Sequence, residues 1–383
     1  MESSITDKKA TGDKIADKRL LSLDFLRGLT VAMMLLVNDP GDWGHIYPPL
    51  EHSKWNGCTP TDLVFPFFLF MVGVSVVYAL QNKKDGPHGK LMLSILRRTL
   101  IIFALGMCFP LIAGVGFAHL RIPGVLQRIA VVYGITALLF IKSNTRTQLI
   151  IAASCLVVYY LLMTLVPVPG IGATNLEPTT NLGAWIDRTV FTPNHLWSQS
   201  KTWDPEGLLG TIPAIGTCLL GVLTGTWLKK DKLKTSRQIF GMTGVGALLI
   251  IAGLIWNIFF PINKALWTSS FVLYTSGITI VMLSLSYWVI DIKGYRKLIP
   301  PFVAFGRNAI TTYVLADIVP TLLSIIPVTS NGHKDSLWGY LYNHLFVPYL
   351  SPVNASLAGG ILMVLIIFVP IWILYLKKIT IKV

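Results

Sequence analysis

The sequence is dominated by ten long apolar runs, each of the roughly 20 residues that an α-helix needs to cross a hydrocarbon layer. Strands of a membrane barrel need only about 10 residues of alternating polarity, so these runs favour helices. Only 13% of the 383 residues are charged and 53% are hydrophobic, whereas soluble domains carry about 25% charged residues. We therefore predict an all-α integral membrane protein with about ten transmembrane helices, over residues 20–38, 62–81, 92–114, 122–141, 147–167, 206–228, 237–259, 267–290, 302–327 and 356–376.

The distribution of lysine and arginine predicts the orientation of these helices. The tail and loops on one side of the predicted spans carry 23 such residues and those on the other side carry five. Cytoplasmic loops hold the excess of basic residues, so both termini are predicted to be cytoplasmic. Residues 1–19 are predicted to form a disordered cytoplasmic tail and residues 20–383 a single transmembrane domain. The same rule explains the net charge of +14, so we expect contact with membrane lipids and no binding of nucleic acid.

The cysteines and the first apolar run exclude some other classes. The four cysteines show no CxxC spacing and three lie inside apolar runs, so neither a disulfide framework nor a metal site is expected. The first run follows a basic segment, as in a signal peptide, but it contains Asp24 and Arg27 and lacks a cleavage motif. We expect it to be a retained helix.

The loop over residues 38–62 reads NDPGDWGHIYPPLEHSKWNGCTPTD and is predicted to face away from the cytoplasm. It combines a histidine, His52, with aromatic side chains that can stack on a sugar ring and with carboxylates that can orient an imidazole; these are Trp43, Tyr47, Trp55, Asp39, Asp42 and Glu51. Simpler roles are open to the same residues. A lone loop histidine is more often a surface residue, Trp43 and Tyr47 suit headgroup anchors, and Trp55 and Asn56 can pin a turn.

Several polar residues fall near the ends of the predicted helices. Asp24 and Arg27 are three residues apart, so they share a helix face and can neutralise each other. Asp62 precedes an apolar run in TPTDLVFPFF, where capping is its expected role. Glu206 is predicted to begin the helix over residues 206–228, on the outer side, and Asn38 to end the first helix, where an asparagine also suits a C-terminal cap.

Further polar residues lie inside predicted helices, where ionisable groups usually face the bundle interior or a water-filled pathway. Gln127 and Arg128 lie in the string LRIPGVLQRIAVVY, and Arg307 and Asn308 lie near the predicted inner end of the helix over residues 302–327. A buried arginine needs a carboxylate or a phosphate partner. Arg307 is at the depth at which a cytosolic phosphate ligand arrives, although an intramembrane ion pair or a lipid headgroup explains it as well.

Four strings in this order carry a resemblance to a known family: LLSLDFLRGLTVAMMLLVN, EHSKWNGCTPTDLVFPFFLFMVGVS, LRIPGVLQRIAVVY and WDPEGLLGTIPAIGTCLLGVLTG. Together they resemble the heparan-α-glucosaminide N-acetyltransferase family. The resemblance implies a membrane enzyme that takes acetyl groups from cytosolic acetyl-CoA and passes them to an amino sugar on the far side. It implies that His52 is the active-site histidine and Asn38 the catalytic asparagine. It also suggests a homodimer, and a chain without an organelle-type luminal domain is expected in a bacterial inner membrane.

On this hypothesis His52 acts as the base or as the carrier of the acetyl group, because its ordinary pKa lies near neutrality. Asn38 donates its amide to the thioester oxygen. The charged and polar groups that need partners are predicted to hold the acetyl-CoA; these are Arg27, Arg128, Gln127, Arg307 and Asn308. The acceptor is predicted to contact Trp43, Trp55, Asn56, Asp62 and Glu206. The alternative is a multi-pass transporter for N-acetylglucosamine-type sugars, since Pro66, Pro123 and Pro213 interrupt predicted helices.

Overall fold

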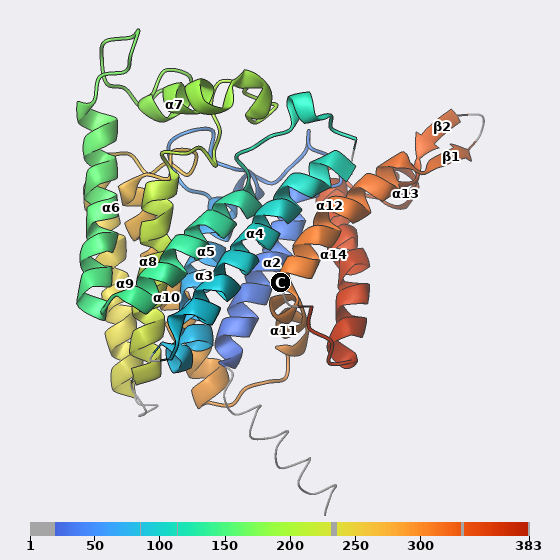
Figure 1. Cartoon of the computed structure of the whole chain (residues 1–383). Helices are drawn as coiled ribbons and strands as arrows, with labels where there is room; N and C mark the ends of the chain where they lie inside the picture. Colours follow the sequence, from blue (N-terminus) through green and yellow to red (C-terminus); the bar gives the residue numbers. More distant parts are fainter. Residues whose placement is uncertain (1–19, 85, 113, 231–235, 331–332, 382–383) are drawn as a thin grey trace, which may run out of the picture.

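The computed structural model describes residues 20–84, 86–112, 114–230, 236–330 and 333–381, which form a bundle of long helices (Figure 1). The predicted tail over residues 1–19 lies outside the described residues. The long helices are α2 (Leu21–Asn38), α3 (Val64–Leu80), α4 (His88–Ile112), α5 (Val125–Lys142), α6 (Thr145–Leu165), α8 (Thr211–Lys230), α9 (Ser236–Trp256), α10 (Ser269–Ser286), α12 (Ala309–Ile325) and α14 (Pro352–Leu376). The shorter elements are α7 (Leu182–Phe191), α11 (Pro300–Arg307), α13 (Leu337–Leu345), β1 (Pro327–Ser330) and β2 (His333–Ser336).

The predicted fold class is confirmed. In the described part of the chain, nine helices are long and apolar enough to span a membrane, or ten if the bent pair α11 and α12 counts as one span. Apolar length was sufficient to find them, because each span must satisfy its own backbone hydrogen bonds in lipid. The orientation of the termini stays a prediction.

Helices α3 and α8 form the centre of the bundle. Their residues, together with those of α5, are the most buried of the long helices, whereas α4 and α9 leave most of their side chains on the outside of the bundle. Gly73 and Gly221 lie where the two helices touch, since a Cβ at either position would overlap a backbone carbonyl of the other helix. This close approach fixes the wall along which the polar residues described below are arranged.

The predicted single helix over residues 302–327 is wrong in one respect: it is broken. Helices α11 and α12 meet at 86°, and Asn308 between them has φ −116° and ψ 37°. Helix α11 packs across α2 at two glycines, because a Cβ at Gly28 would overlap the Phe302 carbonyl and one at Gly306 the Asp24 carbonyl. This crossing holds α11 against α2 while α12 continues in another direction (Figure 1).

The predicted start of the helix at Glu206 is also wrong, because α8 begins at Thr211. Residues 205–209 form turns, and Asp187 of α7 accepts a hydrogen bond from the backbone N–H of Leu208 at 2.8 Å. This contact ties the segment that precedes α8 to α7. Glu206 therefore lies on the loop before α8 and does not begin the helix.

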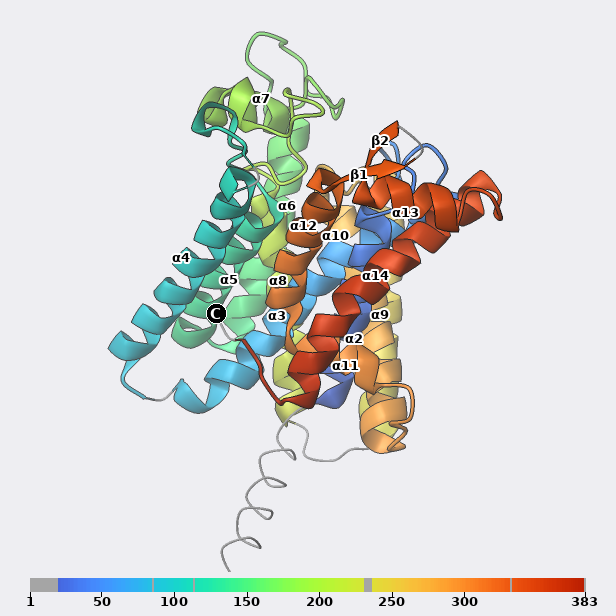
Figure 2. The same cartoon turned by 90° about the vertical axis from the view of Figure 1, so that its right-hand side faces the viewer.

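The loops at one end of the bundle form a second layer. Helix α7 and its flanking segments, α13 and the antiparallel pair of β1 with β2 all lie at the end that also carries the loop with His52 (Figures 1 and 2). The Trp55 indole N–H donates to the Leu176 carbonyl at 2.9 Å, which joins the His52 loop to the segment before α7. We call this end the His52 end. The opposite end, which carries Lys83, Arg97 and Arg98, is called the basic end.

Candidate functional site

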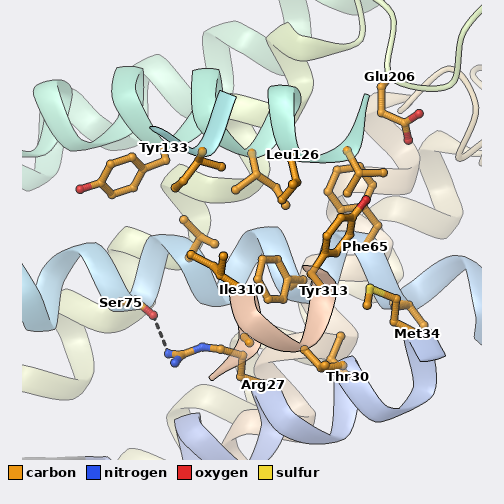
Figure 3. A pocket seen from close by; sticks show the side chains of 18 of the residues that line it. Arg27, Thr30, Met34, Phe65, Ser75, Leu126, Tyr133, Glu206, Ile310 and Tyr313 are labelled. Carbon is orange, nitrogen blue, oxygen red and sulfur yellow. Dashed lines mark hydrogen bonds between the residues drawn. The ribbon is translucent and has the colours of Figure 1, made fainter. Parts of the chain in front are cut away.

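A cavity of about 1260 Å³ runs through the bundle. Its lining follows the chain from Asp62 through α3 to Lys83, a stretch that measures on the order of 30 Å at 1.5 Å per residue. The cavity therefore reaches from the His52 end to the basic end. Figure 3 shows the same course, from Tyr133, Ser75 and Arg27 on one side to Glu206 on the other.

His52 lines the cavity and forms a pair with Asp62. The His52 Nδ1 lies 2.7 Å from the Asp62 Oδ1. Asp62 is buried and its other oxygen, Oδ2, accepts hydrogen bonds from the backbone N–H groups of Ser53 and Thr59, both at 3.0 Å. The predicted cap is confirmed, because Thr59 and Asp62 form a capping box. The same carboxylate thus caps the start of a helix and orients the imidazole.

The sequence had offered three other carboxylates as partners of the imidazole, and none of them is bonded to it. Asp42 lies 2.6 Å from the ring of His45 instead, and this hydrogen bond lowers the pKa of Asp42. Asp39 is the residue that follows α2. The Glu51 backbone carbonyl accepts a hydrogen bond from the Thr59 hydroxyl at 2.6 Å.

Lys264 also reaches His52, although the sequence gave no sign of this contact. Its Nζ lies 3.0 Å from the Nδ1 and 3.3 Å from the Nε2 of the imidazole, and 3.7 Å from the Asp62 Oδ1. Burial lowers the pKa of Lys264, and the negative charge of Asp62 acts in the opposite direction. A carboxylate, an imidazole and an amine therefore meet at the His52 end of the cavity.

Aromatic side chains surround this part of the cavity. Trp55, Trp197 and Trp203 line it together with His52 and Asn38. Trp203 packs edge to face against both other tryptophans, with ring centroids 5.1 Å from Trp55 and 5.2 Å from Trp197. Tryptophan faces suit the apolar faces of sugar rings.

Glu206 lines the cavity as well, close to a buried ion pair network. Its carboxylate accepts a hydrogen bond from the Arg121 guanidinium, and Arg121 binds Asp204 through two further hydrogen bonds. This bidentate geometry fixes the plane of the Arg121 guanidinium. The network anchors the segment before α8 to the segment before α5.

The basic end of the cavity is lined by arginines from three helices. Arg27 of α2 donates to the Ser75 hydroxyl at 2.8 Å, as Figure 3 shows, and lies 3.4 Å from Asp24. The predicted pair of Asp24 and Arg27 is therefore confirmed. Arg98 of α4 lies over the Tyr133 ring, and Arg307 lies 3.9 Å from Asp24. Arg97 and Lys83 complete this lining.

The remaining predicted site residues do not line the cavity in the described part of the chain. Trp43 is largely exposed on the surface. Asn56 binds the Asn263 side chain at 3.1 Å. The Gln127 amide lies 3.4 Å from the Met107 sulfur, and Arg128 donates to the Gly207 carbonyl at 2.8 Å and lies over the Trp267 ring.

Asn308 has a structural partner in the segment that follows α14. Its amide Nδ2 donates to the Ile379 carbonyl at 3.3 Å, and its Oδ1 accepts from the Ile381 backbone N–H at 3.2 Å. That segment turns back from the end of α14 (Figure 2), and Thr380 and Ile381 line the basic end of the cavity. Asn308 thus shapes the cavity by holding this segment.

Comparison with known proteins identifies the family of this chain. The family model described as "Heparan-alpha-glucosaminide N-acetyltransferase, catalytic" matches residues 19–261, which is more than half of the chain. This chain belongs to the heparan-α-glucosaminide N-acetyltransferase family. The family predicted from the four strings is therefore confirmed, and the match includes Asn38, His52 and Asp62. It ends before Lys264 and Arg307.

Two curated relatives in the family carry the name heparan-alpha-glucosaminide N-acetyltransferase. The mouse protein is 30% identical over an alignment of 353 positions, which covers 77% of this chain and 53% of the relative. The human protein is 29% identical over 350 positions, with 77% and 52% covered. The chain therefore spans about half the length of the curated relatives it matches.

Proposed function

We propose that this protein is a transmembrane acetyltransferase that moves an acetyl group from acetyl-CoA to an amino sugar. The donor enters at the basic end, which the excess of lysine and arginine assigns to the cytosol, and the acceptor binds at the His52 end on the other side. The membrane is proposed to be a bacterial inner membrane. The names of the curated relatives support this reaction class.

The observation that carries the proposal is the continuous cavity. A donor confined to one side of the membrane can reach an acceptor on the other side only through a passage in the protein. The lining of the cavity includes both the arginines of the basic end and the pair of His52 with Asp62. An extended pantetheine arm fits such a passage between helices.

The chemistry of the basic end suits the phosphates of the donor. The buried Nε atoms of Arg98 and Arg307 have no hydrogen-bond partner among the described residues. Although Arg307 lies 3.9 Å from Asp24 and Arg98 lies over the Tyr133 ring, each of these Nε atoms can still donate a hydrogen bond to a phosphate oxygen. We assign the phosphates of acetyl-CoA to Arg27, Arg98 and Arg307.

The residues at the His52 end supply what the transfer requires. The acceptor nitrogen attacks the thioester carbonyl carbon, so that a C–N bond forms, the C–S bond breaks and one proton must leave the nitrogen. With Asp62 bound at Nδ1, the Nε2 of His52 is the nitrogen that takes this proton, or that carries the acetyl group in a two-step transfer. The CoA thiolate receives the proton in the end. Asn38 is assigned to the thioester oxygen, and Trp55 and Trp203 to the sugar.

The decisive experiment measures acetyl transfer in detergent, where no gradient exists. Purified protein receives radiolabelled acetyl-CoA and glucosamine, with the His52→Ala variant in parallel. Labelled N-acetylglucosamine from the wild type alone is the expected result. The absence of product across a range of amino sugars would contradict the proposal and would favour the second candidate, a sugar transporter, which the same end-to-end cavity also suits.

Replacement of Arg307 by alanine is expected to weaken acetyl-CoA binding about 10- to 100-fold, because a hydrogen bond to a charged group contributes about 1.5–3 kcal/mol. The Kd is measured by isothermal titration of the detergent-solubilised protein. Binding of the acceptor should be unchanged, since Arg307 lies at the other end of the cavity. The matched control is Arg296→Ala, an exposed arginine that does not line the cavity. Equal donor affinity in Arg307→Ala and the wild type would remove Arg307 from the donor site.

A further inference from the structure

Lys264 occupies a position that no motif in the sequence accounts for. It lies in the loop between α9 and α10, more than 200 residues from His52 in the chain. Its Nζ is nevertheless within 3.3 Å of both nitrogens of the imidazole. An acetyl group that is bound at the His52 ring therefore lies close to this amine.

Two hydrogen bonds besides those of Lys264 itself join its loop to the loop of His52, and a third lies within the Lys264 loop. The Gly57 backbone N–H donates to the Ile262 carbonyl at 2.8 Å. The buried Asn263 donates to the Asn56 side chain at 3.1 Å and accepts from the Leu266 backbone N–H at 2.9 Å. This connection places the start of the Lys264 side chain precisely relative to His52, so the contact does not depend on a free surface loop.

The hydrogen-bonding capacity of the three groups shows what the ammonium can do. When the Nδ1 of His52 donates its proton to Asp62, that nitrogen offers no lone pair to Lys264. The Lys264 ammonium then donates to Nε2, the nitrogen that must take the proton of the acceptor. Once the acceptor amine occupies Nε2, the ammonium has lost this partner, and its nearest carboxylate, Asp62, is 3.7 Å away. A donor beside the reacting carbonyl becomes available at that moment.

We propose that Lys264 is a catalytic residue that donates a hydrogen bond to the thioester oxygen as this oxygen becomes an anion. The inference rests on the proposed acetyl transfer. As the C–N bond forms, the electron pair of the C=O bond moves to the oxygen, and the positive Lys264 Nζ stabilises it together with Asn38. When the C–S bond breaks, the electron pair leaves with the CoA thiolate and the carbonyl is restored. Lys264 keeps its proton throughout.

This role predicts a specific dependence on pH. The charged or titratable groups that face Lys264 are His52, Cys58, Asp62 and Glu206. Burial lowers the pKa of Lys264, and burial raises the pKa of the Cys58 thiol to about 12, so Lys264 loses its proton before Cys58 does. The reaction needs the ammonium, so activity falls as the pH rises through the lowered pKa of Lys264. An arginine at this position stays charged over the whole range.

The experiment compares the Lys264→Met and Lys264→Arg variants with the wild type, in the acetyl-transfer assay from pH 6 to 10. The methionine variant should lose about 10²- to 10³-fold in kcat, as expected for one oxyanion donor, with unchanged KM for both substrates. The arginine variant should recover part of this loss, and its activity should no longer fall at alkaline pH. Lys334→Met, an exposed lysine of β2, is the matched control and should behave as the wild type.

The outcomes separate this inference from the function on which it rests. A wild type that transfers no acetyl group to any amino sugar refutes both. A wild type that is active while the folded methionine variant keeps its kcat within about twofold, a difference well below that of a lost oxyanion donor, refutes the role of Lys264 alone. So does an arginine variant whose alkaline fall is unchanged, or one that is folded but as inactive as the methionine variant. Thermal unfolding establishes which variants are folded. If the methionine variant is not folded, the pH profile of the arginine variant tests the role of Lys264.

Discussion

The His52→Ala variant is expected to lose acetyl transfer by about 10²- to 10⁴-fold in kcat, the range that a positioned general base supplies. The loss should appear in kcat because the imidazole acts on the proton that leaves the acceptor nitrogen during the attack. The affinity for acetyl-CoA should stay within about twofold, because the groups assigned to its phosphates lie at the basic end of the cavity and are unchanged. The loss of one hydrogen bond to a phosphate would lower this affinity by far more than twofold. Initial rates with radiolabelled acetyl-CoA and a separate titration of the donor measure the two quantities.

The chain offers a matched control for this variant in the same loop. His45 is exposed, is bonded to Asp42 at 2.6 Å and does not line the cavity. His45→Ala should therefore retain the wild-type kcat. If His52→Ala and His45→Ala have equal turnover, the imidazole of His52 takes no part in the reaction and the proposed mechanism must be given up.

The helices could be predicted because their cause is local. A run of about 20 apolar residues must become a helix in lipid whatever surrounds it, and the structure moves most of the predicted ends by only a few residues. The break at Asn308 could not be predicted in this way. The break lies next to the contact of Gly306 with the Asp24 carbonyl. These two positions are about 280 residues apart, and no local pattern connects them.

The residues of the candidate site also fall into those that a local pattern indicates and those that depend on contacts between distant segments. The resemblance of the EHSKWNG string pointed to His52, and the TPTD string correctly indicated a capping box at Asp62. The sequence assigned Asp62 to the cap and to contact with the acceptor, and it gave no reason to join Asp62 to His52. Lys264 was counted only as one of five basic residues on the outer side. Its contact with His52 depends on the buried Asn263 and the extended bridge to Gly57, which form only in the folded chain.

Some polar residues inside helices have structural partners that the sequence did not reveal. Arg128 and Asn308 were assigned to acetyl-CoA because buried polar groups need partners. In the structure the Arg128 guanidinium binds the Gly207 carbonyl and the Asn308 amide binds the backbone that follows α14. Backbone groups bind Asn308 and one nitrogen of Arg128, whereas the Nε and Nη1 of Arg128 make no hydrogen bond among the described residues. The identity of such partners cannot be derived from residue types alone.

Replacement of Asp62 by asparagine should reduce kcat the most among single substitutions that preserve the shape of the site. The Oδ2 of Asp62 accepts hydrogen bonds from the N–H groups of Ser53 and Thr59 and from the Thr59 hydroxyl. An asparagine must therefore keep its carbonyl oxygen on that side and turn its NH₂ group toward the Nδ1 of His52. The NH₂ group then donates to Nδ1, which forces the proton of the imidazole onto Nε2.

An imidazole with its proton on Nε2 cannot take a proton from the acceptor there, so kcat should fall on the order of 10³- to 10⁴-fold. The capping hydrogen bonds remain, so the thermal unfolding midpoint should change little, which distinguishes a wrong tautomer from a damaged fold. Alanine would not allow this distinction, because it also leaves the N–H groups of Ser53 and Thr59 without an acceptor. Asp42→Asn, which alters the equivalent pair with His45 outside the cavity, should keep full activity. A folded Asp62→Asn variant with wild-type kcat would show that Asp62 serves only as the helix cap, and that the imidazole works without a carboxylate.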